Sequence, residues 1–225
     1  MLKRTITAAE TYGPCTEIMP EERKRIRSTL PGKSARRLSE GSLAISAAMA
    51  EAIIGPEDDL VFASTLGGTH SLETYLASFP NPSPASFQSS VHAGVVEAVL
   101  VARKQSLRRL QSIGNSPETL VPIALRTALL SDAKVVHLVL AEERGDWLIE
   151  HELCGASTFA CYLRLSRTMD APALGTLALE ISPSDMSSTP AQAPLLTDAF
   201  CQQISQRAPL LIGGPTFGTY SLKWE

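Results

Sequence analysis

The residues of this sequence with the clearest capacity for chemistry are one histidine and the serines around it. His92 follows a stretch rich in proline and serine that includes Ser86, Ser89 and Ser90, and Ser116 lies further along the chain. A histidine can take the proton of a serine hydroxyl and so make the oxygen a nucleophile for acyl transfer. We therefore take His92 and Ser116 as candidate catalytic residues, with Ser90 as an alternative nucleophile.

Each of these residues also has an ordinary structural interpretation, which the sequence favours. Ser116 precedes Pro117 and Glu118, as the N-cap of a helix does, and no Gly-x-Ser-x-Gly pattern surrounds it. His92 is interpreted as a histidine beside a helix start that bonds a nearby backbone group. His137 lies inside an apolar run and is interpreted as a core histidine with satisfied hydrogen bonds.

The elements that must position these residues alternate between strands and helices through the first two thirds of the chain. Strands are expected over residues 1–9, 60–64, 107–114, 135–140, 159–165, 174–181, 210–212 and 218–224, and helices over 38–53, 70–79, 90–104, 116–130 and 195–205. Residues 14–31 are expected to be irregular, with a charged turn at 21–27, and residues 182–194 to form a loop. This order predicts an α/β fold, a layered domain with a mixed β-sheet packed by helices.

Composition narrows the function classes. The 225 residues carry a formal net charge of -3, which argues against a general nucleic-acid binder, and are expected to form a single domain over residues 1–225. No segment has the length and hydropathy of a membrane span or of a signal peptide, so we expect a cytoplasmic protein without a membrane span. Basic residues nevertheless gather near the N-terminus, either as a solvated face or as a docking patch for an acidic partner. They are Lys3, Arg4, Arg23, Lys24, Arg25, Arg27, Lys33, Arg36 and Arg37.

The four cysteines do not form a metal-binding pattern. Cys15, Cys154, Cys161 and Cys201 are widely spaced and contain no Cys-x-x-Cys pair. In a reducing compartment they are best interpreted as free thiols, mostly buried. We expect neither a metal site nor a cofactor.

Several short segments, in this order, resemble the β-ketoacyl synthase-like family of the thiolase fold. They are Arg36-Arg37-Leu38-Ser39, Val61-Phe62-Ala63-Ser64, Ser83-Pro84 with Phe87, Ser90-Val91-His92, and Ala128-Leu129-Leu130 leading to Val135 through Glu142. More narrowly, they are similar to the short homologues found beside bacterial fatty-acid-like and aryl-polyene gene sets. The resemblance spans roughly residues 30–145 and implies the ketosynthase N-terminal, layered fold.

The resemblance also implies where the family's nucleophile would be. In that family a catalytic cysteine lies at the start of a buried helix, where the helix dipole favours the thiolate. The corresponding residues here are Gly114, Asn115 and Ser116, and no histidine follows His151. The resemblance therefore implies the fold without the condensation activity.

Catalytically silent homologues of this kind are chain-length factors. By resemblance, this chain would form a heterodimer with a catalytic ketosynthase subunit, meet an acyl carrier protein through that partner, and limit the acyl chain by blocking a tunnel. Phe87, Val91, His92, Val95 and Asn115, with the helix 116–130, are the residues expected to contact the acyl chain. Two alternatives stay open, namely a stand-alone acyl-thioester enzyme that uses a Ser/His pair, such as an acyltransferase or a thioesterase, and a homodimeric scaffold without an acyl pocket.

Overall fold

One eight-stranded sheet connects the whole described chain. The computed structural model describes residues 2–31, 33–152, 157–168, 171–180, 196–214 and 218–225. In spatial order the strands are β3 (Arg109–Gly114), β2 (Asp59–Ser64), β4 (Val135–Glu142), β5 (Thr158–Ser166), β1 (Leu2–Cys15), β6 (Gly175–Glu180), β8 (Gly218–Trp224) and β7 (Leu210–Gly214). The strands β3, β2 and β4 are parallel and the other neighbours are antiparallel, which confirms the predicted mixed sheet.

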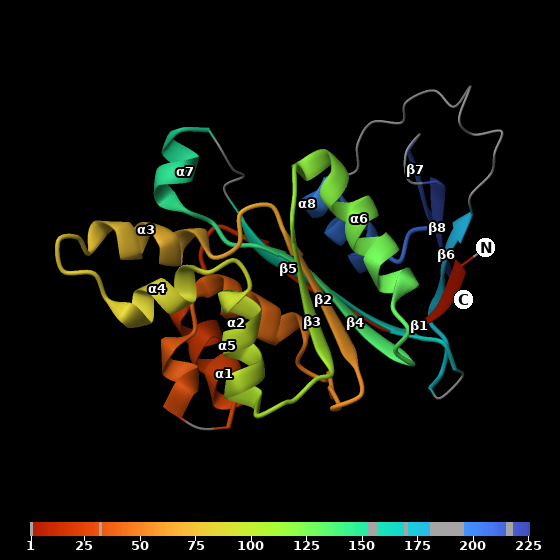
Figure 1. Cartoon of the computed structure of the whole chain (residues 1–225), viewed down its shortest axis with the longest axis horizontal. Helices are drawn as coiled ribbons and strands as arrows, with labels where there is room; N and C mark the ends of the chain where they lie inside the picture. Colours follow the sequence, from red (N-terminus) through yellow and green to blue (C-terminus); the bar gives the residue numbers. More distant parts are fainter. Residues whose placement is uncertain (1, 32, 153–156, 169–170, 181–195, 215–217) are drawn as a thin grey trace.

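Helices cover both faces of the sheet (Figure 1). One face carries α1 (Pro20–Ser28), the 3-10 helix η1 (Lys33–Arg37), α2 (Glu40–Ala48) and α5 (Gly94–Arg103), which pack with Leu60 and Phe62 of β2. The other face carries α6 (Pro117–Leu130) and α8 (Thr197–Ser205), which pack with Val61 and Ala63. Since neighbouring side chains of a strand point to opposite faces, the continuous apolar run of β2 serves both cores. The predicted layered α/β fold is confirmed.

Three further helices extend beyond the carboxyl ends of the parallel strands. They are α3 (Thr69–Ala77), α4 (Pro84–Ser90) and α7 (Asp146–Glu150), which contact one another through α3 (Figure 1). The part of the chain that the structure describes contains no helix long and apolar enough to cross a membrane. The predicted loop 182–194 lies outside the described residues.

The region 14–31 is not irregular, so that prediction is wrong. Residues up to Cys15 belong to β1, and Pro20 opens helix α1 with acidic residues in its first turn and basic residues in its last turn. That charge order matches the helix dipole, and Ile26, which is 3% exposed, anchors the helix in the core. The charges that suggest a turn in the sequence are the solvent face of a helix.

Two predicted helices have other boundaries. The helix expected over 38–53 covers only Glu40–Ala48, and the Ser39 hydroxyl caps it by accepting from the Ser42 amide at 3.2 Å. The helix expected over 90–104 begins at Gly94, after an extended residue at Val91 that separates it from α4. A Cβ at Gly94 would lie 2.6 Å from the Gln88 carbonyl oxygen, so glycine permits this tight passage. The strand expected over 1–9 extends to Cys15. The other predicted strands and helices are confirmed within a few residues of their ends among the described residues.

The three cysteines that the structure describes are free thiols, with Cys161 and Cys201 buried and Cys15 partly exposed. Burial raises the pKa of the Cys201 thiol well above its ordinary value, which keeps it protonated. Cys154 lies outside the described residues. Among those residues, no group of three or more histidine, cysteine or acidic side chains is arranged to hold a metal ion.

His137 is a core histidine, as predicted. It is fully buried on β4, where Nδ1 lies 2.8 Å from the Tyr162 hydroxyl and Nε2 lies 3.1 Å from Oδ2 of Asp58. Burial lowers the pKa of His137, and the hydrogen bond to Asp58 only partly offsets this effect. The folded protein therefore holds this ring in its neutral form.

We expect His137 to make the fold sensitive to mild acid. Because its pKa is lower in the folded than in the unfolded chain, the unfolded chain binds more protons below about pH 6.5, the ordinary value. The free energy of unfolding attributable to this ring should fall there by at most about 1.4 kcal/mol per pH unit. Urea unfolding roughly one pH unit on either side of that value, in the native chain and in His137→Gln, measures the difference. Equal pH slopes in the two proteins would contradict the prediction.

Candidate functional site at the carboxyl ends of the parallel strands

The carboxyl ends of three parallel strands meet at one edge of the sheet. The strands β2, β3 and β4 end at Ser64, Gly114 and Glu142. From β2 the chain continues to β3 on one side, and from β4 it continues to β5 on the other side. Open α/β sheets bind ligands at such a point of divergence, outside the carboxyl ends of the strands.

Two acidic side chains that the sequence analysis did not single out lie at the end of β4. Glu142 accepts hydrogen bonds from the Ser64 hydroxyl at 2.8 Å and from the Thr65 amide at 2.5 Å, and Glu143 accepts from the Gly41 amide at 2.9 Å. Burial raises the pKa of both carboxyl groups, and these hydrogen bonds oppose the rise. The sequence signal was a pair of acids directly after the apolar run 135–141. Glu142 thus ties the end of β2 to the end of β4.

His92 lies in the turn before α5, against the ends of β2 and β3. Its Nδ1 is 2.6 Å from the Ser112 Oγ, and its Nε2 is 3.0 Å from the Ser64 carbonyl oxygen. A carbonyl oxygen only accepts, so Nε2 carries a proton and Nδ1 of the neutral ring accepts from Ser112. A Cβ at Gly67, which has φ +73°, would lie 3.0 Å from the His92 Cα, and one at Gly114 would lie 3.1 Å from Nε2. Two glycines thus make room for the imidazole, which bonds to distant strands and not locally as expected.

The serines that the sequence analysis paired with His92 form hydrogen bonds to other residues. The Ser90 hydroxyl donates to the Phe87 carbonyl at 2.7 Å, and the Ser116 hydroxyl lies 3.0 Å from the Thr119 hydroxyl. Ser116 is the N-cap residue of α6, as predicted, although its side chain makes no capping hydrogen bond. The exposed serine bonded to His92 is Ser112, which is 20 positions away along the chain. A prediction from neighbouring residues missed this contact because it forms only when β3 pairs with β2.

The residues expected to contact an acyl chain are dispersed. Phe87 on α4 and Val91 after it are 53% and 47% exposed, whereas Val95 on α5 is 4% exposed and belongs to the core. Asn115 is exposed before α6, and its Oδ1 accepts from the Ser116 amide at 2.8 Å. Phe87 and Val91 are therefore available at the surface, Val95 supports the helix beneath them, and their assignment to an acyl chain stays a prediction.

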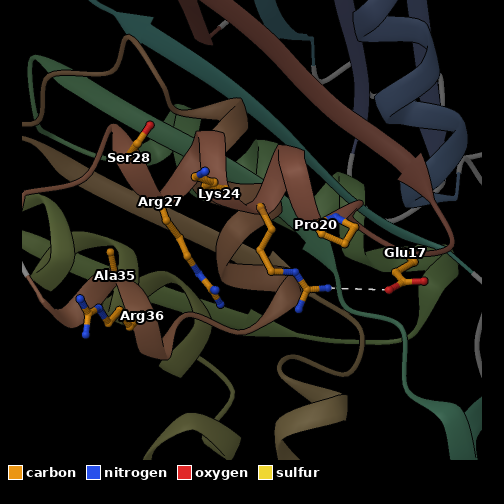
Figure 2. A pocket seen from close by; sticks show the side chains of 8 residues that line it. Glu17, Pro20, Lys24, Arg27, Ser28, Ala35 and Arg36 are labelled. Atoms are coloured by element: carbon orange, nitrogen blue, oxygen red, sulfur yellow. Dashed lines mark ion pairs between the residues drawn. The ribbon is translucent and has the colours of Figure 1, made fainter.

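A concave region lies between α1 and η1, which we call the basic groove (Figure 2). Its volume is about 730 Å³, and its basic lining residues are Arg23, Lys24, Arg27 and Arg36, with Glu17 at one end. Part of the basic N-terminal segment thus converges on one place. Arg4 does not belong to this surface, because it is 1% exposed and its guanidinium donates to buried backbone carbonyls.

No protein-family model matches the sequence, and no curated protein matches it by sequence. Solved structures match it by fold. A chain from a complex of a ketosynthase with its chain length factor from Xenorhabdus doucetiae has a TM-score of 0.61 and 20% identity, covering 99% of this chain and 100% of that one. The ishigamide ketosynthase/chain length factor has a TM-score of 0.56 and 13% identity, covering 82% of this chain and 70% of that one.

A β-ketoacyl synthase from Burkholderia phymatum STM815 has a TM-score of 0.55 and 12% identity, covering 89% of this chain and 71% of that one. Identities this low establish the architecture and not the activity. The mixed sheet, its two helical layers and the strand–turn–helix of β3 and α6 agree with the resemblance found in the sequence. This chain has the thiolase-type fold of the ketosynthases.

Proposed function

We propose that this chain is a ketosynthase-like subunit without condensing activity, a chain-length factor. It would pair with an active ketosynthase in fatty-acid or polyketide biosynthesis of the aryl polyene type. The observation that carries the proposal is the chemistry between β3 and α6, where the family's cysteine would lie. Gly114, Asn115 and Ser116 stand there instead, and the Ser116 hydroxyl bonds to Thr119. None of these side chains supplies a thiolate, so a different role for the fold is favoured.

The position of β3 supports a pairing role. Among the described residues β3 is an edge strand of the sheet, bonded to β2 on one side only. An edge strand presents a row of backbone donors and acceptors that a strand of another chain can extend. Among the matched structures, two carry names that describe a ketosynthase together with a chain length factor.

The proposed mechanism is steric. Phe87 is exposed on α4, and its ring centroid lies 5.4 Å from that of Tyr75 on α3, which holds it in place. An exposed ring supported in this way can cover the end of a partner's acyl tunnel. Growth of the acyl chain then stops when the tunnel has no space for the next unit, because close-packed side chains do not make room for added methylenes.

Co-expression with an active ketosynthase and its acyl carrier protein tests the proposal. We expect this chain to co-purify with the ketosynthase, and Phe87→Ala to lengthen the product while Phe87→Trp shortens it. Val101→Ala on α5 removes a side chain that is also exposed, at 68%, and should leave product length unchanged. The absence of a complex together with identical products from all variants would contradict the proposal.

A second candidate function is hydrolysis of acyl thioesters by this chain alone. The contact between Ser112 Oγ and His92 Nδ1, at 2.6 Å, favours it. In that reaction Nδ1 takes the hydroxyl proton, the Ser112 oxygen attacks the thioester carbonyl, and the thiol leaves with the proton. Water then hydrolyses the ester. We rank this function second because a carbonyl of Ser64, and not a carboxylate, orients the ring.

We expect any thioester hydrolysis by the purified chain to depend on Ser112 and His92. Ser112→Ala or His92→Ala should reduce the rate by about a hundredfold or more, since general base catalysis contributes that much. Ser116→Ala is the matched control, because Ser116 is also exposed but bonds to Thr119, and it should keep the native rate. The release of thiol from an acyl-N-acetylcysteamine thioester measures the activity. Equal rates in Ser112→Ala and the native chain would exclude this mechanism.

A further inference from the structure

The basic groove gathers positive charge in one concave region. Four cationic side chains and one carboxylate line it, although the chain as a whole has a formal net charge of -3. Lys24 and Arg27 come from α1 and Arg36 from η1, so the cations lie on the two elements that flank the groove (Figure 2). Bringing like charges together costs free energy unless an anion lies between them.

Only one of the four cations has an anionic partner within the described residues. Arg23 Nη2 lies 2.6 Å from Glu40 Oε1 and 4.0 Å from Glu17 Oε1. Lys24, Arg27 and Arg36 form no ion pair in the part of the chain that the structure describes. The Nε of Arg27 is moreover shielded from solvent without a hydrogen-bond partner among those residues. The groove therefore holds three cations without an ion-pair partner among the described residues, which an anion would supply.

The stability of α1 does not explain this arrangement. Basic residues in the last turn of a helix favour its dipole, and both Arg25 and Arg27 are placed there. Arg25, however, is exposed and pairs with Glu22 through bonds of 2.8 and 2.6 Å. Arg27 differs because it lines the groove and forms no ion pair within the described residues.

We propose that the basic groove binds the phosphate group of a small phosphate ester. Arginine donates two parallel hydrogen bonds to phosphate oxygens, and lysine adds a compact charge. The groove has a volume of about 730 Å³ and is open to solvent, so a phosphate group can reach its exposed cations Lys24 and Arg36. An acidic peptide is the rival occupant. We disfavour it because its carboxylates are spread along an extended chain, whereas the cations of the groove are gathered at one place. This binding is independent of the proposed pairing through β3, so either can fail alone.

The experiment measures the dissociation constants of the full chain for inorganic phosphate, pyrophosphate, adenosine diphosphate and a glutamate-rich peptide, by calorimetry at low and high salt. We expect at least one phosphate-bearing probe to bind and to bind more weakly in high salt. The double variant Arg27→Gln with Arg36→Gln keeps most of each side chain and should bind about tenfold more weakly or worse. Arg25→Gln, on the same helix but outside the groove, is the matched control and should bind as the native chain does.

The probes also identify the source of the phosphate. Equal affinity for phosphate and adenosine diphosphate supports recognition of the phosphate group alone, whereas tighter binding of adenosine diphosphate supports a larger ester. Thermal unfolding without ligand shows that each variant is folded. The proposal is overturned if no phosphate-bearing probe binds, if Arg25→Gln weakens binding as much as the double variant does, or if the peptide binds more tightly than every phosphate-bearing probe.

Discussion

Replacing Asp59 with alanine is expected to lower the free energy of unfolding by about 2 kcal/mol, because it removes a buried acceptor of several hydrogen bonds. Asp59 is fully buried at the start of β2, where Oδ1 and Oδ2 accept from Arg108 at 2.9 and 2.8 Å. Oδ2 also accepts from the Ser131 hydroxyl at 2.7 Å. The carboxylate thus joins β2 to the segment before β3 and to the end of α6. Alanine would break this link and leave the buried Ser131 hydroxyl without its acceptor, whereas Arg108 would keep Asp132.

The matched control is Asp132→Ala. Asp132 bonds the same guanidinium, with Arg108 Nη2 to Asp132 Oδ1 at 2.5 Å, but its side chain is 71% exposed. Solvent and salt screen such a pair, so the urea midpoint should hardly change. Urea unfolding of both variants at equal temperature compares them. Equal midpoints for Asp59→Ala and Asp132→Ala would show that burial does not govern the strength of this contact.

The same carboxylate has a defined pH dependence. Burial raises the pKa of Asp59, but the hydrogen bonds from Arg108 and Ser131 outweigh it, so the pKa lies below its ordinary value. A group whose pKa is lower in the folded chain stabilises the fold above its unfolded value, about pH 4, and loses this effect as the pH falls. Asp59→Ala should therefore be most destabilising near neutrality and approach the native chain in strong acid.

Blocking the open edge of β3 is expected to weaken pairing with a ketosynthase by at least about tenfold, since proline removes a backbone donor and obstructs the adjoining strand. Neighbouring N–H groups of a strand point to its two sides alternately. One of the variants Gln111→Pro and Ser112→Pro therefore removes a donor that points away from β2, and the other removes a donor to β2. The informative variant is the one that keeps the native urea midpoint. This expectation depends on the proposed pairing.

Leu211→Pro provides the control for the edge variants, because Leu211 is 58% exposed on β7, the strand at the opposite edge of the sheet. Co-purification and the dissociation constant of the complex are compared for all three variants. Loss of pairing with Leu211→Pro but not with the β3 variants would assign the interface to the other edge. Normal pairing in every folded variant would mean that no sheet edge is involved.

Local sequence patterns were sufficient for most of the elements. Apolar runs such as 135–140 are long enough to bury a strand on both faces, and Pro117 after Ser116 marks the start of α6. The failure over residues 14–31 depends on a contact that the local pattern does not reveal. The charges of 20–28 are compatible with a turn or a helix, and the buried contact of Ile26 decides between them.

The sequence by itself determined the alternation of strands and helices, and that Gly114, Asn115 and Ser116, not a cysteine, precede α6. Only the tertiary structure decided that His92 bonds Ser112, that Glu142 bonds Ser64, and that Arg27 and Arg36 line one groove. The physical reason is the distance along the chain over which each kind of interaction acts. Backbone preferences and hydrophobic period act over a few residues and can be recognised locally, whereas these contacts join residues far apart in the chain that meet only after the sheet and its helical layers have assembled.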